Sequence, residues 1–316
     1  MTAGKRVLDI AAAGTHRTSG HRAVCGAAVT GSDSGDRHRR EREIADVNTD
    51  RNFRGSIPAL YDRHLGPLIF VPYADDLALR LADMERGRIL ETAAGTGRLT
   101  RALVSALPAS VSIVATDLNQ PMLDHASSRL PSTRVTWRQA DAQHLPFSDG
   151  EFDAVVCQFG VMFFPDKPRA FSEACRVLRP GGRFLFNVWD RIEENDFADI
   201  VVKSVATLFP ENPPMFVART PHGHHDIAAL AAQVRAAGFS AVTAEIVTRE
   251  SRASSALSVA IGYCQGTPMR NEIEAQDPDR LIEATDAAAA AIARHFGPGP
   301  VTGKIQAHVI TAVRDP

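Results

Sequence analysis

The sequence has few cysteines, and they are scattered. Its 316 residues include four, at positions 25, 157, 175 and 264, and no two of them form a CxxC pair. This spacing excludes a disulfide framework and a structural zinc site of the usual kind. Free thiols in apolar stretches behave as small buried hydrophobic groups, so we expect a reducing, cytoplasmic location.

The sequence also lacks an excess of positive charge and a long apolar run. The formal net charge is -2, and hydrophobic and charged residues make up 44% and 23% of the chain. A nucleic-acid-binding protein usually carries a basic stripe or a strongly basic domain, so we expect no nucleic-acid partner. No apolar run approaches the roughly 20 residues that a membrane-spanning helix needs. The composition is ordinary for a soluble globular protein.

Residues 1–50 lack the hydrophobic periodicity of the rest. They are rich in Ala, Gly, Ser, Thr and Arg, with no sustained helical or strand pattern. We predict a disordered extension there, outside the fold, and place a single domain in residues 51–316.

From residue 88 onward the pattern alternates between strands and helices. Helices are expected after the first strand, over 119–130, after the fourth strand and around 226–237. The expected strands cover residues 88–94, 112–117, 135–141, 152–161, 183–189, 241–249 and 305–313. This alternation predicts an α/β fold with a Rossmann-like, doubly wound, mostly parallel seven-stranded sheet and helices on both faces. Residues 191–225 and 250–303 are interpreted as insertions that form an α-helical cap, and the core that binds a cofactor as about 86–190.

The most informative motif leaves the first strand as Glu91-Thr-Ala-Ala-Gly95-Thr-Gly97. Two glycines permit a tight turn and close approach of the backbone to a ligand. Asp117 ends the next strand, where an acidic side chain can accept hydrogen bonds from both ribose hydroxyls of an adenosine. The combination predicts an adenosine-type cofactor at the first strand-to-helix turn.

The same motif argues against two other nucleotides. The dinucleotide fingerprint needs a third glycine where this chain has Thr100, and a carboxylate at Glu91 would repel a pyrophosphate. Glu91 suits the ammonium group of a methionyl moiety, directly or through water. No GK[ST] sequence follows the glycines, so an ATP-type P-loop is absent.

Four motifs in order carry a family resemblance: ILETAAGTGRLT, ATDLNQPMLDHA, ADAQHLPFSDGEFDAVVCQFGVMFF and ACRVLRPGGRFLF. The stretch from about 88 to 190 resembles the class I S-adenosylmethionine-dependent methyltransferases. Within them it is most similar to the group that resembles the ubiquinone/menaquinone-biosynthesis (type 11) methyltransferases. The resemblance implies S-adenosyl-L-methionine as cofactor and methyl transfer to a small organic acceptor.

The resemblance also assigns roles to individual positions. It implies that residues at the first turn (Glu91, Ala93, Gly95, Gly97) hold the methionine end of the cofactor. Asp117 would bind the ribose, and Leu118 and Met122 would pack on the adenine. The remaining implied contacts are Asp141 and the N–H of Ala142 with the adenine, Gln158 at the junction with the acceptor, and Tyr61 and Phe70 closing over the cofactor.

Each of these positions also has a purely structural interpretation. Asp117 and Asp141 can cap the turns that follow their strands. Met122 and Leu118 can be core residues, and Gln158 can satisfy nearby backbone groups. A histidine cluster at 222, 224 and 225 lacks a cysteine or carboxylate partner at fixed spacing, so we expect a solvated loop and no metal.

The acceptor is the least defined part. Phe197, Leu208, Phe209, Met215, Phe216 and Leu257 in the insertions favour an apolar or aromatic small molecule, but they can equally form the insertions' own core. In methylases of base amines an Asn/Asp-Pro-Pro-aromatic motif follows the fourth strand, where this chain reads Gln158-Phe-Gly-Val. Transfer from a sulfonium depends mainly on alignment, so no catalytic residue is assigned, and Tyr61, His64 and Tyr263 are only candidates.

The sequence does not exclude two other functions. One is a non-catalytic module that binds an adenosine cofactor, and the other is an NAD(P)-dependent oxidoreductase. The atom that receives the methyl group and the oligomeric state do not follow from the sequence.

Overall fold

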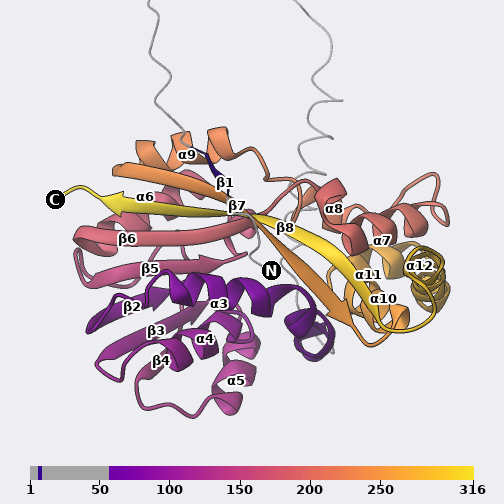
Figure 1. Ribbon diagram of the computed structural model, residues 1–316, viewed down its shortest axis with the longest axis horizontal. Helices are drawn as coiled ribbons and strands as arrows, with labels where there is room; N and C mark the ends of the chain where they lie inside the picture. Colours follow the sequence, from indigo (N-terminus) through magenta and orange to yellow (C-terminus); the bar gives the residue numbers. More distant parts are fainter. Residues whose placement is uncertain (1–5, 9–56) are drawn as a thin grey trace, which may run out of the picture.

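The sheet at the centre of the molecule contains eight strands. The computed structural model describes residues 6–8 and 57–316 (Figure 1). The strands are β1 (Arg6–Leu8), β2 (Gly87–Glu91), β3 (Val111–Asp117), β4 (Val135–Gln139), β5 (Phe152–Gln158), β6 (Leu178–Trp189), β7 (Phe239–Ala253) and β8 (Val301–Arg314). All seven predicted strands are present.

The strand order is β1-β7-β8-β6-β5-β2-β3-β4. The pairs from β6 through β5, β2 and β3 to β4 are parallel, while β8 is antiparallel to both β6 and β7. The chain winds outward in one direction from β2 to β4 and in the other from β5, so the order reverses between β2 and β5. In open sheets of this kind, ligands bind at the carboxyl ends of the strands at such a reversal.

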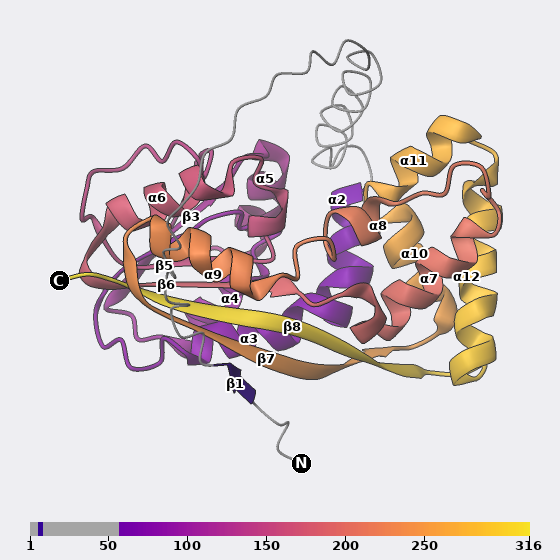
Figure 2. The same cartoon turned by 90° about the horizontal axis from the view of Figure 1, so that it is seen from above.

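The hydrophobic pattern of the strands explains their positions. Ile89, Leu90 and the run Ala154–Cys157 are fully buried, as expected for parallel strands covered on both faces. In β8, side chains alternate between buried and partly exposed from Val301 to Ala307. The long β7–β8 hairpin continues past the parallel strands and reaches the helical end of the molecule (Figure 2).

Helices cover both faces of the sheet. They are α3 (Val71–Leu79), α4 (Arg98–Ala106), α5 (Gln120–Arg129), α6 (Lys167–Val177) and α9 (Ile227–Ala236). Helices α3 and α4 pack together on one side, and α6 and α9 pack together on the other (Figure 2). Helix α6 begins where the Asp166 carboxylate accepts a hydrogen bond from the Arg169 N–H, and it buries Phe171 and Ala174 on one face.

A second group of helices stands at one end of the sheet (Figure 1). It contains α7 (Asp196–Ala206), α8 (Phe216–Arg219), α10 (Ala256–Gln265), α11 (Met269–Gln276) and α12 (Arg280–Phe296), with the short helices η2 (Val161–Phe163) and η3 (Ile192–Glu194) nearby. Helices α7, α8, α10, α11 and α12 come from the two segments predicted as insertions, and α10 and α12 pack on each other and on α7. The doubly wound sheet with an α-helical cap is therefore confirmed.

Two features of the fold were not predicted. Residues 57–70 form α2 (Ile57–Leu60) and a π-helical segment, η1 (Tyr61–Phe70), which run into α3. Three residues of the expected extension form β1 and pair antiparallel with β7, so the sheet has one strand more than predicted. The rest of the predicted disordered extension lies outside the described residues.

Within the part of the chain that the structure describes, no helix is long and apolar enough to cross a membrane.

Candidate active site

Two turns with unusual backbone meet where the strand order reverses. Ala93, after β2, has φ 53°, and Phe159, after β5, has φ 51°. Non-glycine residues rarely adopt this region, and such conformations persist where the surroundings hold them. The side-chain Oδ1 of Asn187 holds the second turn by accepting a hydrogen bond from the Phe159 N–H at 2.8 Å.

Gly160 lets the two turns approach each other. A Cβ at this position would overlap the Cβ of Ala93 and would lie 2.8 Å from Cys157 Sγ. Glycine is therefore required here by close packing, because Gly160 itself has a negative φ of -96°. The turns together form the floor of an open cavity.

Asp117 connects the glycine loop to the end of β3. Its Oδ2 accepts a hydrogen bond from the Gly95 N–H at 2.8 Å, and its Oδ1 accepts one from the Asn119 N–H at 2.8 Å. Burial raises the pKa of this carboxyl, although hydrogen bonds from Asn119 and Gly95 oppose the shift. Asp117 thus caps the local turns, as its structural interpretation states, and also lies in the cavity.

Asp141 has a similar position after β4. Its Oδ1 accepts hydrogen bonds from the backbone N–H of Gln143 at 2.9 Å and from the side chain of Gln143 at 3.1 Å. Partial burial opposes ionisation, but these bonds and the nearby His144 lower the pKa of Asp141. The carboxylate is charged at neutral pH and faces the same cavity as Asp117.

The first cavity has a volume of about 810 Å³ and contains eight of the ten predicted cofactor residues. These eight are Ala93, Gly95, Asp117, Leu118, Met122, Asp141, Ala142 and Gln158. The side chain of Leu118 is 45% exposed, whereas that of Met122 is only 4% exposed. Gln158 also donates a hydrogen bond from Nε2 to the Phe70 carbonyl at 2.7 Å.

The two other predicted residues do not line this cavity. Gly97, with φ 75°, starts α4, and a Cβ there would lie 3.1 Å from Ala126 and Trp137, so it serves helix packing. Glu91 is 1% exposed, and its Oε2 accepts a hydrogen bond from the Thr100 hydroxyl at 2.6 Å. Burial raises the pKa of Glu91 to about 8, with the Thr100 hydrogen bond opposing and Asp117 adding to the shift. The expectation that Glu91 faces the ligand directly is therefore not met in this structure.

A second cavity of about 540 Å³ adjoins the first. Tyr61, Phe159 and Phe163 line both cavities. The remaining walls are largely apolar and come from Leu65, Ile69, Phe70, Met162, Trp189, Asn195, Phe216, Val217, Pro221, His222, Tyr263 and Thr267. Phe159 stacks on Trp189 with ring centroids 3.8 Å apart, which makes a flat aromatic wall.

Most of the apolar residues predicted to contact the acceptor do not reach this cavity. Of the six, only Phe216 lines it. Phe197 is fully buried against Phe296 inside the cap, while Met215 and Leu257 are 40% and 48% exposed. Leu208 and Phe209 pack on the core of the cap. For Phe197, Leu208 and Phe209 the structure thus supports the alternative interpretation, a core of the insertions themselves, while Met215 and Leu257 belong to neither the cavity nor a buried core.

The segment η1 closes the site from the N-terminal side. Tyr61 lies in both cavities and stacks on Phe70 at 4.9 Å, whereas Phe70 reaches only the second cavity. Burial, with a further contribution from Asp117, raises the pKa of the Tyr61 hydroxyl. The neighbouring Asp62 is buried and accepts hydrogen bonds from Thr96 and Arg98, which ties η1 to the glycine loop. Burial opposes ionisation of Asp62, but Arg98 and these bonds lower its pKa.

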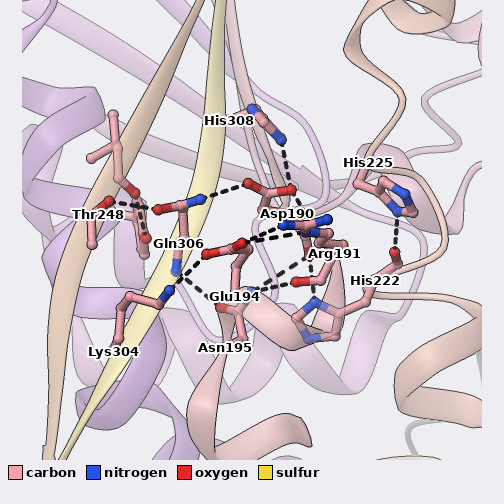
Figure 3. Close-up of polar contacts among 12 residues, drawn as sticks. Asp190, Arg191, Glu194, Asn195, His222, His225, Thr248, Lys304, Gln306 and His308 are labelled. Atoms are coloured by element: carbon pink, nitrogen blue, oxygen red, sulfur yellow. Dashed lines mark hydrogen bonds and ion pairs between the residues drawn. The ribbon is translucent and has the colours of Figure 1, made fainter. Parts of the chain in front are cut away.

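The histidines differ from the sequence interpretation. His222 is 5% exposed and lines the second cavity, so the prediction of a solvated loop is wrong for this residue. It lies beside a polar network that joins the end of β6 to the cap and to β8 (Figure 3). His64, a candidate base, lines neither cavity and is hydrogen-bonded to Ser258 Oγ at 3.0 Å, while the candidate Tyr263 lines the second. Among residues 6–8 and 57–316, no group of three or more His, Cys, Asp or Glu is placed to hold a metal ion.

Solved structures share the fold. Phosphoethanolamine N-methyltransferase 2 from Haemonchus contortus, in complex with S-adenosyl-L-methionine, aligns with a TM-score of 0.53 at 17% identity, over 84% of this chain and 59% of that one. YcgJ protein from Bacillus subtilis aligns with a TM-score of 0.50 at 19% identity, over 78% of this chain and 99% of that one. At these identities the likeness concerns the fold alone.

Sequence relatives match less than half of the chain. An uncharacterized protein of Mycobacterium tuberculosis is 35% identical over 138 residues, which are 43% of this chain and 47% of that protein. A demethylmenaquinone methyltransferase of Lactiplantibacillus plantarum is 39% identical over 101 residues, 31% of this chain and 43% of that one. The matches thus span less than half the length of these relatives. Residues 90–186 match the family described as methyltransferase domain.

Proposed function

We propose that this protein transfers the methyl group of S-adenosyl-L-methionine to a small, mainly apolar acceptor. The observation that carries the proposal is the pair of adjoining cavities with three shared wall residues, Tyr61, Phe159 and Phe163. The first cavity lies within the matched methyltransferase domain, at the reversal of strand order. The second is lined by aromatic side chains and suits the acceptor.

The residues of the first cavity fit the cofactor. Asp117 and Asp141 offer carboxylate oxygens to hydroxyl and amino groups, and their separate strands space them along one ligand. We assign the ribose to Asp117, the adenine to Asp141, Ala142, Leu118 and Met122, and the methionine end to the turn at Ala93 and Gly95. Glu91 is buried beneath that turn, so it would interact with the ammonium group of the cofactor through water.

When bound, the cofactor supplies an electrophilic methyl group on a sulfonium. The chain's own contribution is to orient the two ligands and to exclude water between them. Phe159 and Phe163 line both cavities, and Gln158, next to Phe159, lines the first and donates a hydrogen bond to the Phe70 carbonyl. This arrangement supports in-line transfer from the first cavity to the second.

An NAD-dependent reaction is disfavoured by the same loop. The side chain of Thr100, at the position of the third glycine in dinucleotide sites, is buried and bonded to Glu91. The pair fills the space where helix and strand would otherwise pack closely beneath a pyrophosphate.

Calorimetric titration of the full chain with S-adenosylmethionine, S-adenosylhomocysteine and NAD tests the cofactor assignment. We expect micromolar binding of the first two and none of NAD. Binding of NAD alone, or of no nucleotide by folded protein, would contradict the proposal. Binding without S-adenosylhomocysteine formation on a broad acceptor panel would favour a non-catalytic module. A cytoplasmic location and the absence of a nucleic-acid partner stay predictions from composition.

A further inference from the structure

The second cavity offers few polar groups to a ligand, and most of them are occupied. Asn195 accepts a hydrogen bond from the Gln306 N–H at 3.0 Å and donates one to the Arg191 carbonyl at 3.2 Å. The Thr267 hydroxyl donates to the Tyr263 carbonyl at 2.7 Å. Both ends of Asn195 and the proton of Thr267 are used by the protein. The tyrosine hydroxyls of Tyr61 and Tyr263 also line the cavity, but burial raises the pKa of both, and among the side chains of this cavity only the imidazole of His222 carries a basic nitrogen.

The hydrogen bond made by His222 determines its tautomer. Its Nδ1 lies 2.8 Å from the backbone carbonyl oxygen of Asp190 (Figure 3). A carbonyl oxygen only accepts, so Nδ1 must carry the proton. In the neutral ring Nε2 is then an acceptor, and no hydrogen bond to it is present within the described residues. A lone pair therefore stands at the wall of a largely apolar cavity.

The surroundings keep the ring neutral. Burial lowers the pKa of His222 to about 4, and His225 adds to this shift, while Asp190 and Glu193 oppose it. The carboxylate of Asp190 is engaged elsewhere, by His308 Nε2 at 3.1 Å and Gln306 Nε2 at 2.8 Å. Trp189 covers the ring from the sheet side with a centroid distance of 6.0 Å. His222 is thus an oriented acceptor of hydrogen bonds at neutral pH.

We propose that the acceptor is a phenol, held among the aromatic walls with its hydroxyl donating to Nε2 of His222, which takes the proton during transfer. The proposal rests on the methyl-transfer function above. In the step, the phenol oxygen forms a bond to the methyl carbon as the carbon–sulfur bond breaks. The bonding pair stays on sulfur as a neutral thioether, and the hydroxyl proton passes to Nε2. The resulting imidazolium returns its proton to water when the methyl ether leaves.

The cavity favours a phenol over an amine for two reasons. Flat aromatic walls from Phe159, Trp189 and Phe216 match the faces of an aromatic ring. No carboxylate lines the cavity, so no ion pair is available there to an alkylammonium ion. A neutral base suits a hydroxyl, whose proton becomes strongly acidic as the oxygen–carbon bond forms.

The binding test uses 2-naphthol and naphthalene, which differ only in the hydroxyl group. Calorimetry compares wild type with His222→Phe, His222→Gln and the control His295→Phe, each with and without S-adenosylhomocysteine. His295 is an exposed histidine on α12 outside both cavities, so its replacement makes the same chemical change elsewhere. We expect wild type and His295→Phe to prefer 2-naphthol by about tenfold, and His222→Phe to lose this preference.

The rate test separates a hydrogen-bonding role from proton transfer. The glutamine oxygen in His222→Gln accepts a hydrogen bond but is a very weak base. We expect it to restore the preference for 2-naphthol, while formation of S-adenosylhomocysteine with 2-naphthol stays about 10²- to 10⁴-fold below wild type. The affinity for S-adenosylmethionine should be unchanged in all three variants, which shows that they fold.

Several results would overturn the proposal. They are equal affinity of wild type for 2-naphthol and naphthalene, no binding of 2-naphthol, a preference that survives in His222→Phe, or full turnover in His222→Gln. Failure of the methyl-transfer function gives a different result, namely no binding of S-adenosylmethionine. In that case a preference for 2-naphthol that depends on His222 would leave the binding site in place and remove the proton-transfer role.

Discussion

The two cavities meet at the same three side chains but are built in different ways. The first is formed by turns that follow β2, β3, β4 and β5, and, apart from Tyr61, its walls come from residues 93–165. Backbone groups and two carboxylates shape it. The second takes its walls from η1, the end of β6, α8 and α10, which are far apart in the sequence. A site made from consecutive turns can be recognised by motif, whereas a site made from distant helices cannot.

The largest expected effect is a loss of affinity for S-adenosylmethionine when Asp117, which lines only the first cavity, is replaced. Replacing Asp117 by Ala removes a carboxylate that would bind both ribose hydroxyls and that holds the Gly95 N–H. We expect the affinity for S-adenosylmethionine to fall by about 100-fold in calorimetry, as for the loss of charge-assisted hydrogen bonds. Asp124→Ala, an exposed carboxylate on α5, is the control and should change nothing. An unaltered affinity in Asp117→Ala would remove this residue from the cofactor site.

The next effect concerns the stability of the fold where the turns at Ala93 and Phe159 meet. Gly160→Ala would push a methyl group into Ala93 and Cys157, so the two turns would have to separate. We expect the free energy of unfolding in denaturant titration to fall by about 1–3 kcal/mol. Gly299→Ala, which has open space around it, should be close to neutral. Equal stability of the two variants would mean that the contact between the turns is not tight.

The third expected effect is the release of a proton from Glu91 when the cofactor binds. With its pKa near 8, Glu91 is mostly protonated at pH 7, and a nearby ammonium group favours the ionised form. Cofactor binding should therefore release close to one proton, and affinity should rise about tenfold from pH 6 to pH 7. Calorimetry in buffers of different ionisation enthalpy measures the release.

Two controls locate this proton. Adenosine, which lacks the ammonium group, and the variant Glu91→Gln should both bind without the pH dependence. If Glu91→Gln retains it, another group is responsible for the release.

The smallest expected effect comes from changing a residue that lines only the second cavity. Val217→Phe places extra volume in the second cavity, which Val217 lines and the first does not. We expect 2-naphthol affinity to fall about fivefold in calorimetry and S-adenosylmethionine affinity to stay the same. A parallel loss of both would show that the cavities do not act independently.

The comparison also explains which predictions failed. The strands, the turn at Gly95 and the carboxylates at Asp117 and Asp141 were predicted because hydrophobic runs and turn residues are local signals. For Phe197 and Phe209 the sequence left two interpretations open, because composition does not distinguish a cavity wall from the core of an insertion. His222 was predicted to be solvated, because a sequence with three nearby histidines does not indicate which of them will be buried.

The sequence by itself determined the order of strands and helices, the turns at the reversal and the chemistry of the first cavity. In each case the responsible residues are neighbours in the chain or end adjacent parallel strands. Only the tertiary structure decided which side chains of η1, α8 and α10 enclose the second cavity, that Thr100 holds Glu91, and that the Asp190 carbonyl sets the tautomer of His222. These contacts depend on how whole elements pack on the sheet, and long-range packing leaves no local pattern in the sequence.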